Sequence, residues 1–291
     1  MNIIQSNEYG NVSLTQHTAD VAILHVEHAK SKASVSLYGG QVLSWQPRGH
    51  EDVLWMSSAT EYQSGKAIRG GIPLCWPWFG PFNDAGNHGF ARQSQWKYTE
   101  ITISAEHVTL VLEFVGEQCH GAWPHSFKLT QTLVFGEQFT QSLAITNRTD
   151  KTFECTGALH SYFRVSHPEN VTVPNLDRCT FDDKITQQNG VADELVNCEG
   201  PIDRIYYTNQ SQKIMDSGLR RIIDVESNGC EQWVLWNPGQ AIADQMPDIH
   251  PGGFNEYVCL EAANTQWITV PAQQSIEMSQ RVKVTPLDKH G

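Results

Sequence analysis

Apolar and polar residues alternate in several separate segments of the chain, and this alternation predicts β-strands. In 107–115, in 125–135 and in the last segment, 275–284, an apolar side chain returns at every second position with few exceptions. The positions that share an apolar face are Val108, Leu110, Leu112 and Phe114, then Phe127, Leu129, Leu133 and Phe135, and finally Ile276, Met278, Val282 and Val284. Because successive side chains of a strand point to opposite faces of its sheet, each segment is expected to bury one face.

Turn signals separate these segments. The sequence at 135–139 predicts a tight reversal into the strand 140–147. Asn228-Gly229 is a type I′ turn signal, and we expect it to join 219–226 and 231–236 in a hairpin. A loop rich in Gly and Pro follows at 237–255, with one helical turn expected at 241–246.

The pattern as a whole indicates an all-β protein. No long segment has helical periodicity, and many short strands with a turn every 8–12 residues are typical of a sandwich or barrel. The number of strands favours a large antiparallel two-sheet sandwich. No linker, break in composition or internal repeat divides the chain, so residues 1–291 are expected to form a single domain.

The segment 67–92, AIRGGIPLCWPWFGPFNDAGNHGFAR, differs from every other part of the chain. Its glycines and prolines exclude a continuous helix and limit strands to short pieces. Arg69 and Arg92 lie near its two ends, with large aromatic residues between them. The segment is either a rigid wall for an anionic, partly apolar ligand or a well-packed connection whose arginines face solvent.

Composition and charge restrict the partners. The chain has 20 basic and 32 acidic residues, a net charge of −12, which argues against nucleic acid or an anionic membrane surface as partner. No stretch approaches the ~20 apolar residues that span a bilayer, and the N-terminus lacks the pattern of a signal peptide. The seven cysteines form no CxxC pair, which fits reduced thiols. We therefore expect a cytoplasmic protein, and a monomer by default.

Several common catalytic motifs are absent from the sequence. It has no GxxxxGK[ST] loop, no GxGxxG after a strand, no GxSxG and no HExxH. The twelve histidines are scattered, and no pair stands at a metal-ligand spacing beside a carboxylate. Nucleotide-dependent transfer, hydride transfer and elbow-type serine hydrolysis therefore have no support, and a metal is not expected.

Three residues stand out as candidate acids or bases. His160 lies on an apolar strand, where it is either a satisfied core residue or a catalytic group. Glu261 follows an apolar strand segment, and a buried Glu is usually paired or functional; alternatively it reaches water at a strand end. Asp203 either binds a ligand, pairs with its neighbour Arg204 or caps a turn. Partial burial would bring both His and Glu toward the neutral pKa that general acid–base catalysis needs.

Five short motifs in a fixed order give the chain a family resemblance. They are IRGGIP at 68–73, PWFG at 77–80, HGFAR at 88–92, LHSYF at 159–163 and LEAAN at 260–264. Together they resemble the glucose-6-phosphate 1-epimerase (D-hexose-6-phosphate mutarotase) family within the aldose-epimerase superfamily. The resemblance runs from about residue 39 to the last strand, and it implies the galactose-mutarotase-like supersandwich fold.

The resemblance also implies an activity and a site. The family interconverts the α and β anomers of an aldohexose 6-phosphate without a cofactor, so the partner would be a small sugar phosphate. By position the site residues would be His160 as catalytic acid, Glu261 as catalytic base, Arg69 and Arg92 at the phosphorylated sugar, Asp203 at the sugar hydroxyls and Asn87 as a further ligand contact. Trp76, Trp78 and Phe79 could pack on the sugar, although at least two of them are expected in the core.

Two other kinds of function remain open at this point. The same sandwich could bind a carbohydrate without converting it, with His160 and Glu261 as hydrogen-bonding groups. It could also cleave a glycosidic bond, which requires two carboxylates that flank the bond. Glu261 and Asp203 are the candidates, and the sequence does not place them opposite each other.

Overall fold

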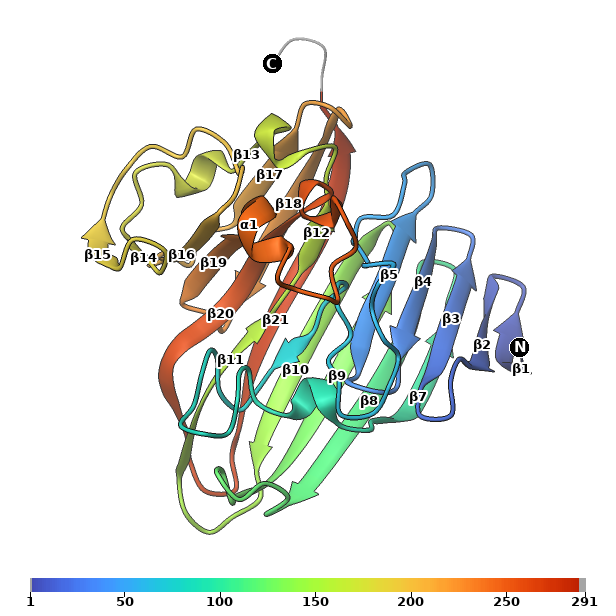
Figure 1. The fold of residues 1–291 in the computed structure, drawn as a ribbon. Coiled ribbons are helices and arrows are strands. Elements are labelled where there is room, and N and C mark those ends of the chain that lie inside the picture. Colours follow the sequence, from blue (N-terminus) through green and yellow to red (C-terminus); the bar gives the residue numbers. More distant parts are fainter. Residues whose placement is uncertain (1, 288–291) are drawn as a thin grey trace.

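The computed structural model describes residues 2–287, and strands dominate it (Figure 1). All strand pairs are antiparallel, apart from one isolated parallel bridge, and they form three hydrogen-bonded sheets. Within the described residues, no helix has the length and apolar character needed to cross a membrane.

The N-terminal sheet contains the first five strands in sequence order. They are β1 (Asn2–Asn7), β2 (Gly10–Gln16), β3 (Ala22–His28), β4 (Ser31–Ser36) and β5 (Gln41–Pro47). Each strand pairs with the next along the chain, so this sheet is a simple meander.

The β9 sheet has eight strands in the order β13-β17-β18-β21-β10-β9-β8-β7. They are β7 (Lys97–Ile103), β8 (Val108–Glu117), β9 (Ser126–Phe135), β10 (Gln138–Asn147), β13 (Val171–Thr172), β17 (Gln212–Asp216), β18 (Arg221–Asn228) and β21 (Ser275–Pro286). The predicted reversal at 135–139 is confirmed, because Phe135 and Phe139 are opposite each other where β9 turns into β10.

The β20 sheet has the order β15-β14-β16-β19-β20-β11-β6, and β12 also pairs with β20. Its strands are β6 (Leu74–Cys75), β11 (Phe153–Leu159), β12 (Tyr162–Arg164), β14 (Phe181–Asp183), β15 (Gln188–Val191), β16 (Ile202–Tyr206), β19 (Gln232–Asn237) and β20 (Tyr257–Val270). β20 is the longest strand of the sheet, with 14 residues.

Helical segments are short. They are the α-helix α1 (Gly239–Ala243) and the 3-10 turns η1 (Ala91–Gln93), η2 (Pro168–Asn170), η3 (Pro174–Leu176) and η4 (Gly253–Asn255). The helical turn expected at 241–246 is therefore present but begins two residues earlier.

The three sheets form two layers, which confirms the predicted all-β sandwich. On the inner face of the β9 sheet, Trp45 of β5 packs against Phe139 of β10 with ring centroids 5.8 Å apart. The β20 sheet covers the same face, because Ser161 bonds to Gln280 of β21 there. One layer is thus the β9 sheet, and the N-terminal and β20 sheets share the other.

The predicted alternation along β9 is confirmed. Every second residue of the strand is buried, and the four predicted apolar residues all lie in the main core cluster. The polar Gln131 occupies a fifth position on this buried face. The amide of Gln131 needs a hydrogen-bonding partner, because burying an amide without one destabilises the fold by about 1–3 kcal/mol.

A chain of buried amides supplies that partner and links the two layers. The amide of Gln131 donates to the carbonyl of Gly40 at 2.6 Å and accepts from Gln141 at 2.6 Å. Gln280 donates in turn to Gln141 at 2.8 Å and to the hydroxyl of Ser161 at 2.9 Å. The turn that carries Ser161 and its neighbour His160 is therefore tied to the centre of the β9 sheet.

The prediction of a hairpin at Asn228-Gly229 is wrong. β18, before the turn, pairs with β17 and β21, whereas β19, after it, pairs with β16 and β20. The chain crosses here from one layer to the other. Gly229 does adopt the positive φ (72°) that the motif signals, and a Cβ there would lie 2.0 Å from the carbonyl oxygen of Glu277. The motif reports a left-handed turn residue, but the partners of the two strands are decided by their apolar faces.

Candidate active site

A cavity of about 680 Å³ opens over the β20 sheet. Its floor consists of side chains at alternate positions on three adjacent strands, and its walls come from the loops 67–92 and 237–255. The lining residues are Arg69, Phe79, Gly80, Pro81, Asn87, His88, Arg92, His160, Lys184, Asp203, Ile205, Tyr207, Val234, Trp236, Met246, Glu261, Thr265 and Gln266. All six residues predicted for the site lie among them.

His160 and Glu261 meet because the register of β20 against β11 and β12 places them opposite each other. Leu159, the last residue of β11, is opposite Ala262, whereas Tyr162, the first residue of β12, is opposite Cys259. The register is the same on both sides, so His160 lies opposite Glu261 and Ser161 opposite Leu260, and the carbonyl of Ser161 accepts from the N–H of Leu260 at 3.2 Å. This places Nε2 of His160 3.4 Å from Oε1 of Glu261.

Both groups are buried, and each has a polar atom without a partner. His160 is 7% exposed and Glu261 is 1% exposed. Nδ1 of His160 and Oε2 of Glu261 make no hydrogen bond to any described residue. Buried polar atoms normally find partners, so an unpaired acid and base at the floor of a cavity suggest a site arranged for a ligand.

Burial shifts the two pKa values in opposite directions. It holds the pKa of His160 well below its ordinary value, and His88 and the two arginines add to this effect. Burial likewise raises the pKa of Glu261 well above its ordinary value, and the charge of Asp203 contributes. Both shifts favour the neutral forms, because a low dielectric disfavours charge.

His88 is a member of the site that the sequence reasoning missed. It lies in the loop 67–92 at a positive φ of 65°, and its ring is 5.8 Å from that of His160 at an angle of 75°. Nδ1 of His88 accepts from the backbone N–H of Gly80 at 3.2 Å, which leaves the proton on Nε2. Burial, then Arg92 and Arg69, lower its pKa to about 3. His88 is thus a neutral hydrogen-bond donor to the cavity.

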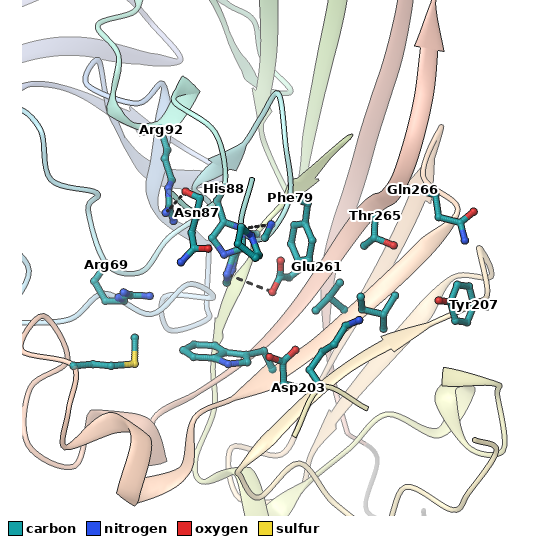
Figure 2. A pocket seen from close by; sticks show the side chains of 18 residues that line it. Arg69, Phe79, Asn87, His88, Arg92, Asp203, Tyr207, Glu261, Thr265 and Gln266 are labelled. Carbon is teal, nitrogen blue, oxygen red and sulfur yellow. Dashed lines mark hydrogen bonds and ion pairs between the residues drawn. The ribbon is translucent and has the colours of Figure 1, made fainter. Parts of the chain in front are cut away.

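The two predicted arginines stand at one end of the cavity, together with Asn87 (Figure 2). Arg69 is held on two sides. Its Nε and Nη2 donate to Oδ2 of Asp248 at 2.9 and 2.8 Å, and its Nη1 donates to the hydroxyl of Tyr162 at 2.7 Å. Three of its five N–H donors are used, and two are left.

Arg92 lies in η1 and has fewer contacts. Its Nη2 donates to the backbone carbonyl of Asn87 at 3.1 Å, and its buried Nε has no partner among the described residues. No carboxylate of residues 2–287 forms an ion pair with it. The positive charge at this end of the cavity is therefore mainly that of Arg92, because Asp248 balances Arg69.

Asp203 faces the cavity and does not pair with Arg204. The guanidinium of Arg204 points away from it, to Oδ2 of Asp183 at 3.2 Å. This follows from strand geometry, since consecutive residues of β16 point to opposite faces. Burial raises the pKa of Asp203 to about 6, although nearby Lys184 opposes the shift.

The aromatic residues of the loop divide as expected. Trp76 and Trp78 are fully buried in the core, and Phe79 lines the cavity. Beyond His88, the sequence reasoning also missed Ile205 and Tyr207, which follow Asp203 at period two. It also missed Thr265, which lies four residues after Glu261 on the same face of β20. Extending the alternation from each candidate along its own strand would have found all three.

The arrangement can perform proton transfer on an anionic polyol. An acid and a base in contact serve two oxygens that lie next to each other on the ligand. Arginines suit an oxyanion because the guanidinium makes two charge-assisted hydrogen bonds from one plane. Figure 2 places Glu261 between the arginine end and the opposite end, where Tyr207, Thr265 and Gln266 lie.

Comparisons with known proteins agree with this chemistry. The family model for aldose 1-epimerase matches residues 22–283. A protein of Escherichia coli K12 named "Putative glucose-6-phosphate 1-epimerase" is 36% identical over 273 residues, which cover 90% of this chain and 91% of that protein. A protein of the same name from Cenchrus ciliaris is 30% identical over 79% of this chain and 74% of its own length.

Solved structures share the fold. A crystal structure described as a "putative mutarotase" from Salmonella typhimurium superposes with a TM-score of 0.88 at 32% identity, covering 97% of this chain and 95% of that one. An aldose 1-epimerase-like structure from Escherichia coli K12 matches with a TM-score of 0.69 at 14% identity, over 92% of this chain and 100% of that one, which supports the fold alone. The chain therefore belongs to the aldose 1-epimerase family and is a sugar mutarotase.

Proposed function

We propose that the protein interconverts the α and β anomers of an aldohexose 6-phosphate, with glucose 6-phosphate as the foremost candidate. The observation that carries the proposal is the buried His160–Glu261 contact of 3.4 Å, in one cavity with Arg69 and Arg92. The contact supplies the proton chemistry, and the arginines supply the affinity for phosphate. The names of the relatives from Escherichia coli and Cenchrus ciliaris point to the same substrate.

The proposed reaction opens and recloses the sugar ring. Glu261 as carboxylate takes the proton from the anomeric hydroxyl O1, while His160 as imidazolium gives a proton to the ring oxygen O5. The C1–O5 bond breaks and C1 becomes an aldehyde carbon. After rotation about the C1–C2 bond, O5 attacks the other face of C1, and the two residues return the protons. Positioned proton transfer of this kind contributes about 10²–10⁴-fold to a rate.

One shared proton is enough for both directions. The pair exists either as imidazolium beside carboxylate or as neutral imidazole beside carboxyl, and burial favours the neutral arrangement. The proposed resting arrangement therefore has the proton on Glu261, and it crosses to His160 before the ring opens. Ring opening then consumes the charged pair and yields the neutral one, so the buried environment favours this step.

The other residues orient the substrate in this proposal. O1 and O5 are both bonded to C1, so they reach two groups that are themselves in contact. The neutral His88 donates from Nε2 to a sugar oxygen, and the carboxylate of Asp203 accepts from sugar hydroxyls. Arg92 and the two remaining donors of Arg69 bind the phosphate.

The proposed setting is the cytoplasm, and the seven free cysteines among the described residues fit a reducing compartment. The proposed ligand is a small molecule, and the proposed state is a monomer.

Polarimetry that starts from the pure α anomer of glucose 6-phosphate tests the function. The protein should speed the approach to the anomeric equilibrium without changing its final position. The same assay on glucose should give a smaller kcat/KM, because the arginine end stays empty. No acceleration of either sugar, or binding without turnover, would leave a carbohydrate-binding protein instead.

A further inference from the structure

Tyr162 connects the two functional parts of the cavity without lining it. The residue is 1% exposed and begins β12, two positions after His160. Its hydroxyl accepts the hydrogen bond from Nη1 of Arg69 at 2.7 Å. Its ring stacks on the imidazole of His160, with centroids 4.8 Å apart and planes only 6° from parallel. One side chain therefore contacts both the arginine end and the acid.

The stacking contact matters because little else fixes the imidazole. A functional histidine usually has its second ring nitrogen held by a carbonyl or a carboxylate, which sets its tautomer and its plane. Nδ1 of His160 has no such partner among residues 2–287. Glu261 contacts the edge of the ring, His88 and Trp236 pack against it edge to face at 5.8 and 6.2 Å, and Tyr162 is the one ring among the described residues that stacks in parallel with it.

Tyr162 is itself firmly placed. On β12 it is opposite Cys259 of β20, two residues from Glu261. Its ring also stacks on Trp55 at 5.9 Å and packs against Tyr257 at 5.1 Å. A packed aromatic ring resists deformation and moves as a rigid body. A displacement of Arg69 is therefore passed through the ring of Tyr162 to the imidazole.

We propose that Tyr162 is a positioning residue that couples phosphate binding at Arg69 to the orientation of His160. The inference rests on the proposed function. Phosphate that binds the two remaining donors of Arg69 adds a second anion to a guanidinium already paired with Asp248, and the hydroxyl of Tyr162 is the contact that carries the change toward the imidazole. Binding energy from the phosphate is then used at the reacting centre, which raises kcat rather than affinity alone.

The variant Tyr162→Phe tests the coupling because it keeps the ring and removes the hydroxyl. On glucose 6-phosphate, kcat should fall roughly tenfold, as expected for a lost hydrogen bond to a charged group. The loss on free glucose should be several times smaller, because no phosphate engages Arg69. Equal losses on both sugars, or no loss on the phosphorylated one, would overturn the proposal.

Tyr257→Phe is a matched control. Tyr257 belongs to the same buried aromatic cluster, and its hydroxyl has no hydrogen-bonding partner among the described residues. Removing that hydroxyl should change both sugars alike. A preferential loss on glucose 6-phosphate in this variant would show that any change in the cluster suffices, and it would contradict a specific role for Tyr162.

A binding measurement separates this proposal from the proposed function. Inorganic phosphate titrated into the wild-type protein should shift the ¹⁵N NMR signals of the His160 imidazole, assigned with a His160→Gln variant. In Tyr162→Phe the shift should be at least halved at saturating phosphate. Equal shifts in both proteins would overturn the coupling, whether or not the sugars turn over. A wild-type protein without anomer exchange would instead contradict the proposed function.

Discussion

The two ends of the proposed chemistry are built in opposite ways. Arg69 has a counter-ion, Asp248, and a hydroxyl acceptor, Tyr162, so most of its donors are satisfied before a ligand arrives. His160 and Glu261 are more deeply buried, and each keeps a polar atom without a partner. The recognition group sits on a glycine-rich loop, whereas the acid and base sit on or beside strands of the β20 sheet.

The difference reflects what each end must do. A guanidinium that binds phosphate loses little by being held in place in advance, since preorganisation reduces the entropy cost of binding. An acid and a base must change protonation during the reaction, and full satisfaction would hold them in one state. Strands and the buried amide chain from Gln131 to Ser161 keep these two groups in position without occupying their free polar atoms.

The largest effect is expected from Glu261→Gln. This variant cannot accept a proton from O1, so kcat/KM on glucose 6-phosphate should fall by about 10²–10⁴-fold. Steady-state polarimetry on both anomers measures it. A variant that retains more than a tenth of the activity would assign the base to another group.

The same substitution should stabilise the fold at neutral pH. The folded-state pKa of Glu261 is raised, so its contribution to stability is complete below the unfolded pKa, ~4.3, and is lost as pH rises toward the folded pKa. Glutamine avoids that loss. Each 1 kcal/mol regained should raise Tm by about 2 °C in a chain of this length. An unchanged or lower Tm at pH 7.5, measured by calorimetry, would argue against a buried carboxyl that is costly to ionise.

Arg92→Ala should have the next largest effect, and only on phosphorylated sugar. The lost charge-assisted hydrogen bonds are worth about 1.5–3 kcal/mol each, or roughly 10- to 100-fold in kcat/KM on glucose 6-phosphate. Arg92 forms no ion pair among the described residues, so stability should hardly change.

The matched variant Arg69→Ala should lose similar activity and should also lower Tm, because it leaves Asp248 without its ion-pair partner. Equal losses on glucose and its 6-phosphate would exclude a role in reading phosphate.

The pH profile should lack the acid limb of an ordinary histidine. The pair works while it holds one proton, and it gains a second only below the depressed pKa of His160. It loses the proton only above the raised pKa of Glu261. With free glucose, which avoids the phosphate titration near pH 6, kcat/KM should stay within about threefold between pH 6 and 7.5. A tenfold fall per pH unit below 6.5 would place an ordinary imidazole in the reaction.

Asp203→Asn should give the smallest effect. Weaker acceptance from sugar hydroxyls costs about 0.5–1.5 kcal/mol, so kcat/KM should drop by roughly 2- to 10-fold. The modest step near pH 6 that titration of Asp203 contributes should disappear in the variant. A loss as large as that of Glu261→Gln would instead indicate two carboxylates that share the chemistry.

The sequence predicted the sheets far better than their connections. Every second residue of β9 is buried because one face of the sheet packs on the core and the other faces outward. The alternation of apolar and polar residues in the sequence predicts this directly. The crossing at Gly229 was missed because a turn motif specifies a dihedral angle and not the partners of the flanking strands. In the site, motifs led to His160 and Glu261, but the contact between them depends on the register of β20 against β11 and β12, which no local pattern specifies. Asp248 lies 179 positions from Arg69, and no local pattern pairs them.

A double-mutant cycle on His160 and Glu261 tests the central claim most directly. The claim is that the two residues exchange one proton with the substrate as a unit. In kcat/KM on glucose 6-phosphate, His160→Gln and Glu261→Gln should each lose about 10²-fold or more, and the double variant should lose no more than the worse single variant. Losses that multiply in the double variant would mean that the two residues act independently, and the account would be wrong.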